Sequence, residues 1–226
     1  MTVRQSVAAA RLAVVNDTSG KSRAAIPESG SPLSGRGRPR DAGADRRILE
    51  ATFRQLVDVG YGALSIEAVA AEAGVAKTTI YRRYPTKAEL VVDALRVEVA
   101  FVPPPGDIDA RTALELFVRQ AIAVLIDSGA IRILGSFLVE EAREPGLLDV
   151  FRERIIGPRR GLVEQMLRRG IERGEIRSDI DPLIVTEMIA GAIVGHHAIL
   201  GLTATDDWVR SLVDHVWAAI ATNSSK

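Results

Sequence analysis

Residues 62–95 read GALSIEAVAAEAGVAKTTIYRRYPTKAELVVDAL, and this stretch decides the fold. Ser65 is a helix cap, and the apolar residues after it recur at helical spacing until Gly74. A second short helix, expected from about Ala76 to Tyr84, ends before Pro85 because proline cannot continue a helix. The sequence therefore predicts two short helices joined by a tight turn.

Four residues in this stretch have the types and the spacing that a helix-turn-helix requires. Ala70 is small enough to let the second helix cross the first closely, and Gly74 accepts the positive φ of the turn. Val75 and Ile80 are apolar and fill the angle between the two helices. A pair of helices held in this way presents the second one to the major groove of DNA.

The outer face of the second helix is basic. Between Gly74 and Lys87 there are four basic residues and no acidic one. The side chains expected to point away from Ile80 are Lys77, Thr78, Arg82 and Arg83, with hydroxyls near the helix end from Tyr81 and Tyr84. A solvated basic face is the alternative, but a short polar helix at a fixed crossing angle suits the major groove better.

Helical periodicity continues on both sides of the motif. Upstream, a helix opens at Asp45 and closes at Gly60. Downstream, Thr86 and Glu89 form a capping box, which predicts a helix that reaches about Phe101 before three consecutive prolines. Longer helices are predicted at 109–128, 130–143, 146–174, 181–202 and 206–222. Because no useful two-residue period occurs, the chain is predicted to be all-α.

Composition excludes several classes of protein. Of the 226 residues, 47% are apolar, which suffices for a globular core, and the absence of cysteine excludes disulfide, zinc-finger and iron–sulfur frameworks. No catalytic constellation occurs, and His196 and His197 diverge by about 100° on a helix, which favours packed or interface histidines over a metal site with His215. We therefore predict no catalytic residue, no metal and no cofactor. No signal peptide and no uncharged run of about 18 residues occur, so we expect a cytoplasmic protein without membrane contact.

Positive charge gathers at the N-terminal end, although the chain is neutral overall. Residues 1–40 hold seven basic and two acidic side chains, whereas residues 91–226 hold fifteen basic and twenty acidic ones. The run Gly35-Arg36-Gly37-Arg38-Pro39-Arg40 is similar to the core of an AT-hook, in which arginines flanking a glycine enter a narrow minor groove. We predict DNA contacts from Arg36 and Arg38, with a solubilising tail as the alternative.

Residues 62–95 resemble the DNA-binding domain of the TetR family of bacterial repressors, and the resemblance covers about residues 44–95. In that family the short third helix enters the major groove, and a tyrosine and a lysine hold phosphates. The residues that match these roles are Tyr81 and Lys87 for phosphate, and Lys77, Thr78 and Thr79 for the groove. Together with Ser65, Arg82, Arg83 and Tyr84, they form the predicted DNA site.

Three positions of the short helix depart from the family pattern. Ala76 stands where the family often has serine, which weakens the helix cap. Arg82 and Arg83 stand where the family often has histidine or tyrosine, which adds charge. The individual base and phosphate roles of these two arginines are therefore left open.

Residues 169–201 resemble the segment that leads into the dimer helix of TetR-type effector domains. Gly191 and Gly195 lie four apart on an apolar helix and would let another helix approach, with packing inside the chain as the alternative. The predicted dimer residues are Gly191, Gly195, His196 and Trp217. The predicted effector pocket consists of Phe117, Phe137, Met166 and Met188, for which a role as ordinary core residues is the alternative.

The resulting prediction divides the chain into three segments. Residues 1–43 form a flexible basic arm, residues 44–103 form a three-helix helix-turn-helix domain, and residues 104–226 form a helical bundle for effector binding and dimerisation. The resemblance implies a homodimeric repressor that binds a palindromic double-stranded DNA operator and is released by a small molecule. The alternatives are a DNA-binding protein without effector control and an enzyme with a helical accessory domain.

Overall fold

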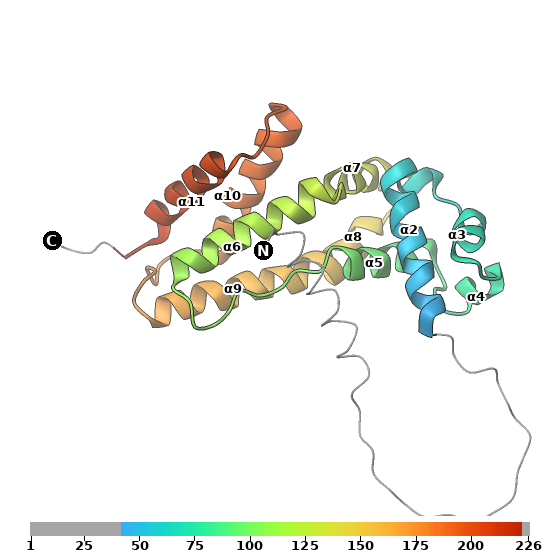
Figure 1. Cartoon of the computed structure of the whole chain (residues 1–226), viewed down its shortest axis with the longest axis horizontal. Helices are drawn as coiled ribbons and strands as arrows, with labels where there is room; N and C mark the ends of the chain where they lie inside the picture. The colour runs from blue at the N-terminus through green and yellow to red at the C-terminus, as the bar shows by residue number, and fades with distance from the viewer. Residues whose placement is uncertain (1–41, 223–226) are drawn as a thin grey trace, which may run out of the picture.

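A computed structural model describes residues 42–222 of the chain (Figure 1). Helices follow one another in the predicted order, so the all-α class is confirmed. The molecule is elongated, with α3 and α4 at one end and with α10 and α11 toward the other (Figure 1). Two long helices, α6 and α9, run side by side between these ends.

Capping side chains and glycines set the ends of the N-terminal helices. Their bounds are α2 Ala42–Ala63, α3 Ile66–Ala73, α4 Lys77–Tyr81 and α5 Lys87–Glu98. Ser65 Oγ caps α3 by accepting a hydrogen bond from the Ala68 amide, and Gly74 ends it at φ 65°. Thr86 Oγ1 caps α5 through the Glu89 amide at 3.1 Å. α2 is broken at Gly60, which has φ 75° and ψ 175°, as the predicted stop at this glycine requires.

The short helix α4 differs from the prediction in length. It ends at Tyr81, whereas the sequence predicted helix as far as Tyr84. Regular helix ends there, but the amides of Arg83 and Tyr84 both donate to the Ile80 carbonyl at 2.9 Å, so one irregular turn continues toward Pro85.

The C-terminal helices match the predicted spans and contain three π-helical segments that the sequence did not predict. The elements are α6 Ala110–Ile122, η1 Ala123–Asp127, α7 Ala130–Glu140, α8 Leu147–Phe151, η2 Arg152–Ile156, α9 Gly157–Glu172, α10 Pro182–Val194, η3 Gly195–Ile199 and α11 Asp206–Ile220. Asp109 and Asp181 cap α6 and α10 through their carboxylates. Gly129, at φ 77°, separates η1 from α7, and the chain bends there by 63°.

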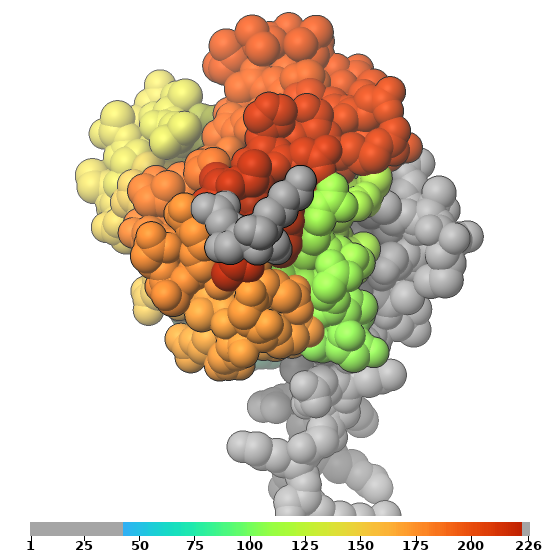
Figure 2. Space-filling view, turned by 90° about the vertical axis from the view of Figure 1, so that its left-hand side faces the viewer, coloured from blue at the N-terminus to red at the C-terminus, as the bar shows by residue number. Residues whose placement is uncertain are grey.

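Buried side chains form two cores. The first core joins α2–α5 to α7 and α8, and the second joins α6 to α9, α10 and α11. Figure 2 shows α6, α9 and α11 meeting at the end of the molecule where the second core lies. The predicted domain boundary at residue 103 stays a prediction, but side-chain packing crosses it because α7 and α8 belong to the first core.

An aromatic contact joins α2 to α7 inside the first core. The rings of Tyr61 and Phe137 meet edge to face with centroids 5.4 Å apart, and both residues are buried. The Tyr61 hydroxyl donates to Glu144 Oε2 at 2.9 Å, and the Tyr61 amide donates to Ser136 Oγ at 3.2 Å. The end of α2 is therefore packed against C-terminal helices rather than against its own motif alone.

Candidate DNA-binding site

The helix-turn-helix is held by the residues that its spacing singled out. Ile80 is fully buried in the first core, and Ala70 is 5% exposed where α4 meets α3. The amide of Val75 donates to the Ala70 carbonyl at 3.0 Å, which closes the turn after Gly74. Because one face of α4 is anchored in this way, its opposite face has a fixed orientation.

The outward face of α4 presents polar and basic side chains. Lys77, Thr78, Tyr81 and Arg82 are exposed, as predicted, and the Tyr81 side chain keeps half of its surface open to solvent. Thr79 is partly buried between this face and the core. These positions form a compact surface, which we call the α4 face.

Lys77 has a partner that the sequence did not reveal. Its ammonium forms an ion pair with Glu67 on α3, and this carboxylate raises the pKa of Lys77. Glu67 Oε2 also accepts a hydrogen bond from Ser65 Oγ at 3.1 Å. Ser65 is therefore a helix cap and a neighbour of Glu67. Ten residues separate Lys77 from Glu67, and only the crossing of the two helices brings them together.

Arg83 and Tyr84 point toward α2 and the first core instead of joining the α4 face, and their predicted contact with DNA stays a prediction. Arg83 Nε lies 2.5 Å from Asp45 Oδ1 on α2, and its side chain is only 19% exposed. Tyr84 packs against the first core, and burial raises the pKa of its hydroxyl to about 12. Both residues follow the end of α4, where the turn before Pro85 directs them toward α2.

Lys87 lies at the start of α5 and contacts the end of α2. Its ammonium donates to the Gly62 carbonyl at 3.3 Å and lies 4.5 Å from the centroid of the Tyr61 ring. Burial lowers the pKa of Lys87, and the nearby carboxylates of Glu144 and Glu140 oppose this shift. This lysine is partly exposed beside the motif, and the carboxylates that act on its charge belong to the C-terminal part of the chain.

The two arginines of the N-terminal arm cannot be placed. Arg36 and Arg38 lie outside the described residues, so their predicted contact with DNA stays a prediction.

Comparison with known protein families matches the helix-turn-helix region and the C-terminal helices separately. Residues 48–94 match the family described as bacterial regulatory proteins, tetR family, and residues 104–216 match the tetracyclin repressor-like C-terminal domain. An HTH-type transcriptional regulator of Mycobacterium tuberculosis is 33% identical over 80% of this chain and 89% of that protein. The chain belongs to the TetR family. Members of this family are DNA-binding transcriptional repressors and are typically ligand-responsive dimers, not enzymes.

Two further relatives support the same assignment. The DNA-binding transcriptional repressor TetR of Mycobacteroides abscessus is 30% identical over 75% of this chain and 89% of that protein. A crystal structure of a TetR family transcription regulator is 26% identical and covers 79% of this chain and 99% of that chain, with a TM-score of 0.63. The similarity therefore extends over both the motif and the C-terminal helices.

A second exposed surface of this TetR-family protein lies on α10. Val185, Ile189 and Ile193 face the second core, whereas other apolar residues on the same helix and just after it remain open to solvent. The exposed residues are Leu183, Ile184, Met188, Ile199, Leu200 and Leu202. We call this surface the α10 face.

The α10 face is unusually apolar for an exposed helix. By length and composition, the span Pro182–Ile199 is apolar enough to cross a membrane. Only 17% of this span is buried inside the chain, so most of its surface is left uncovered. A Cβ atom added at Gly191 or Gly195 would meet nothing within 4 Å. Close packing of another described helix against these two Cα positions is therefore not seen within the chain.

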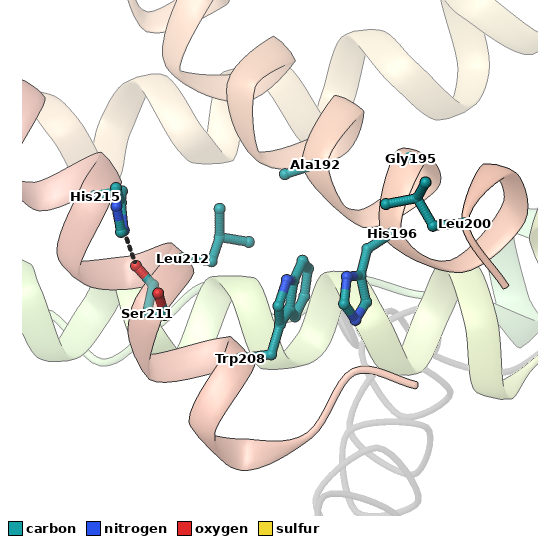
Figure 3. A pocket seen from close by; sticks show the side chains of 8 residues that line it. All are labelled: Ala192, Gly195, His196, Leu200, Trp208, Ser211, Leu212 and His215. Atoms are coloured by element: carbon teal, nitrogen blue, oxygen red, sulfur yellow. Dashed lines mark hydrogen bonds between the residues drawn. The ribbon is translucent and has the colours of Figure 1, made fainter. Parts of the chain in front are cut away.

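A groove of about 380 Å³ lies between α10 with η3 and α11 (Figure 3). His196 stacks on Trp208 with ring centroids 4.1 Å apart, and His196 Nε2 lies 3.1 Å from the Thr203 carbonyl. His215 Nδ1 lies 2.7 Å from the Ser211 carbonyl. Trp217, also predicted at the dimer interface, is partly buried against the second core.

The four residues predicted to line an effector pocket do not lie together in one core, and their role in binding an effector stays a prediction. Phe117 and Met166 are buried in the second core, whereas Phe137 is buried in the first. Met188 is 41% exposed on the α10 face. Helical spacing identifies apolar faces, but it does not indicate which of two cores a face will enter.

Proposed function

We propose that this TetR-family chain binds a palindromic operator as a homodimer, with α4 of each copy in the major groove. The observation that carries the proposal is the α4 face, because it combines a rigid anchor with exposed polar and basic side chains. Two such helices about one duplex turn apart, at ~34–36 Å, read the two halves of a palindrome.

The side chains of the α4 face differ in their readiness to contact DNA. Thr78, Tyr81 and Arg82 are exposed and can reach base edges or phosphates directly. Lys77 must exchange its ion pair with Glu67 for a contact with DNA. Since the side chains of Lys77 and Glu67 are 45% and 64% exposed, solvent screens the pair and the exchange carries little penalty.

Lys87 is the second basic contact in the proposal. It lies at the N-terminal end of α5, where the positive end of the helix dipole adds to its charge. We infer that it binds a phosphate, for which it must give up its present contact with the Gly62 carbonyl at the end of α2. The arm residues Arg36 and Arg38 extend the proposed contact into the minor groove.

A second copy of the chain is the proposed partner of the α10 face. Exposed apolar side chains around Gly191 favour close packing of another helix, and α10 with α11 from each copy would make a four-helix interface. Glu187 is exposed in the middle of the α10 span, where a membrane would penalise its charge. A protein partner therefore accounts for this face better than a lipid bilayer does.

We further propose that a small molecule bound among the C-terminal helices releases the protein from DNA in the cytoplasm. The contact between Tyr61 and Glu144 supports this part of the proposal, because it ties α2 to the segment after α7. A shift of the C-terminal helices would then reach the motif. A DNA-binding protein without effector control is the second candidate, and it differs in that no ligand would change its operator affinity.

Selection of bound sequences from random double-stranded DNA tests the proposal. We expect two inverted half-sites whose centres are one helical turn apart, bound by two copies of the chain. The variant Thr78→Ala should lose preference at one symmetric pair of positions, whereas Thr112→Ala, on the distant helix α6, should retain the wild-type site. Recovery of sequences without any common site, or of a single half-site, would contradict the proposal.

A further inference from the structure

A cavity of about 350 Å³ lies between the end of α5 and the segment formed by η2 and α9. Its apolar lining includes Val99, Phe101, Ile155 and Leu162. Arg96, Arg154 and Arg159 also line it, and no acidic side chain does. The cavity therefore combines an apolar wall with three positively charged side chains.

Arg159 is the least satisfied of the three arginines. Its guanidinium donates to the Val99 carbonyl at 2.8 Å and lies 5.4 Å from the Phe101 ring centroid. Within residues 42–222 no carboxylate pairs with it, and burial lowers its pKa to about 10. A partly buried guanidinium with one neutral acceptor retains donors for an anion.

The other two arginines are held only loosely by carboxylates outside the cavity wall. Arg154 lies 3.8 Å from Glu89, and Arg96 lies 3.5 Å from Asp93. Both side chains are more than two-fifths exposed, so these pairs contribute little to stability. They can therefore turn toward an anion in the cavity at little cost in free energy.

We propose that this cavity binds an organic carboxylate with an apolar chain or ring. The carboxylate would take a two-point hydrogen bond from Arg159, and its apolar body would cover Phe101, Ile155 and Leu162. At ~30 Å³ for each water-sized group, the cavity holds about twelve non-hydrogen atoms. A medium-chain fatty acid anion or a phenylalkanoate has this size.

The same arginines connect the cavity to both ends of α5. Arg159 satisfies the Val99 carbonyl just beyond the C-terminal end of the helix, and Arg154 pairs with Glu89 in its first turn. A carboxylate is a stronger acceptor than a backbone carbonyl, so a ligand would draw Arg159 away from Val99. Loss of the hydrogen bond to Val99 would free the C-terminal end of α5. Because Lys87 lies at the other end of the same helix, a movement of α5 would disturb the proposed phosphate contact. This step rests on the proposed function.

Calorimetric titration of the full chain without DNA tests the cavity itself. The probes are octanoate and 4-phenylbutanoate, with octanamide and acetate as the neutral and the chain-free controls. We expect at least one of the two larger carboxylates to bind at least tenfold more tightly than either control. Binding of octanamide as tight as that of octanoate, or no binding of either larger carboxylate, would overturn the proposal.

Two variants and a matched control assign the binding to this cavity. Arg159→Gln removes the charge but keeps a donor for Val99, and Leu162→Trp fills the apolar end. Each should weaken carboxylate binding at least tenfold while thermal unfolding shows a folded protein. Arg160→Gln changes the neighbouring arginine, which is 47% exposed and lies outside the wall, and should bind like wild type. Wild-type binding by both cavity variants would refute the site.

Operator release is measured separately, so that the two proposals can fail independently. Fluorescence anisotropy with the selected duplex should show weaker DNA binding when the carboxylate is present, and no change for Arg159→Gln. If the chain selects no DNA sequence, the proposed function fails and the calorimetric result still decides the cavity. If the carboxylate binds but leaves the operator affinity unchanged, the link through α5 is refuted.

Discussion

The α4 face and the α10 face are both exposed, but they are opposite in chemistry. The α4 face is short, polar and basic, and its geometry is fixed by the buried Ile80 behind it. The α10 face is long and apolar, with two glycines at which an added Cβ would meet no described atom within 4 Å. Water solvates the α4 face well. Burial of the α10 face would instead contribute about 25 cal/mol of stabilising free energy for each Å² of apolar area removed from water. The difference indicates an anionic partner for one face and an apolar one for the other.

The largest expected effect comes from placing a charge on the α10 face. Met188→Asp would bury a carboxylate in the proposed interface, so we expect a monomer in analytical ultracentrifugation. Operator affinity should fall by about a hundredfold or more, because two linked half-site contacts become independent. Anisotropy with the selected duplex measures this change in affinity.

Leu138 provides the matched control for that prediction. Its side chain is 60% exposed on α7, outside the α10 face. Leu138→Asp should therefore remain a dimer with wild-type operator affinity. A dimeric Met188→Asp protein, or an equal weakening in both variants, would show that the apolar surface of α10 is not the partner surface.

Two adjacent arginines test how sharply the α4 face is bounded. Arg82→Ala removes an exposed charge, so we expect the free energy of unfolding to stay unchanged. DNA binding should weaken about tenfold for each half-site, because a hydrogen bond from a charged group contributes roughly 1.5 kcal/mol. Arg83→Ala removes the partner of Asp45, so it should lower the free energy of unfolding by about 1–2 kcal/mol. Urea unfolding and anisotropy separate the two effects, and the reverse assignment would place Arg83 on the DNA side.

The salt dependence of binding distinguishes charged from neutral groups near α4. Lys87→Ala should weaken binding to all sequences alike and flatten the slope of log affinity against log salt by about 0.9 for each phosphate that the lysine neutralises in the wild-type complex. Tyr81→Phe should weaken binding without changing the slope, because a hydroxyl releases no counterion. An altered base preference in either variant would argue against a role in phosphate binding.

The smallest expected effect tests whether the α4 face is the whole DNA surface. Removal of residues 1–40 should leave a folded dimer and reduce affinity most on operators flanked by A·T pairs, where a narrow minor groove attracts arginine. Arg36→Ala with Arg38→Ala should reproduce most of that reduction. Equal affinity on A·T-rich and G·C-rich flanks, with and without the arm, would leave only the α4 face.

Local features of the sequence were sufficient to predict the helices and the motif. Ser65, Gly74 and Thr86 act on backbone groups within a few residues of themselves, so their effect can be inferred without knowledge of the fold. Regular helix in α4 ends at Tyr81, a few residues before Pro85, and helical spacing does not indicate this earlier end. The three π-helical segments have no local signal that we recognise in the sequence.

The sequence by itself determined the helix-turn-helix and the outward direction of Lys77, Thr78, Tyr81 and Arg82, because helical spacing and one buried anchor define a face. Only the tertiary structure decided the partners that come from other helices. It turned Arg83 toward Asp45, paired Lys77 with Glu67, and placed Phe137 and Phe117 in different cores. The physical reason is distance along the chain: capping and periodicity act over one or two turns, whereas contacts between helices depend on how whole elements pack.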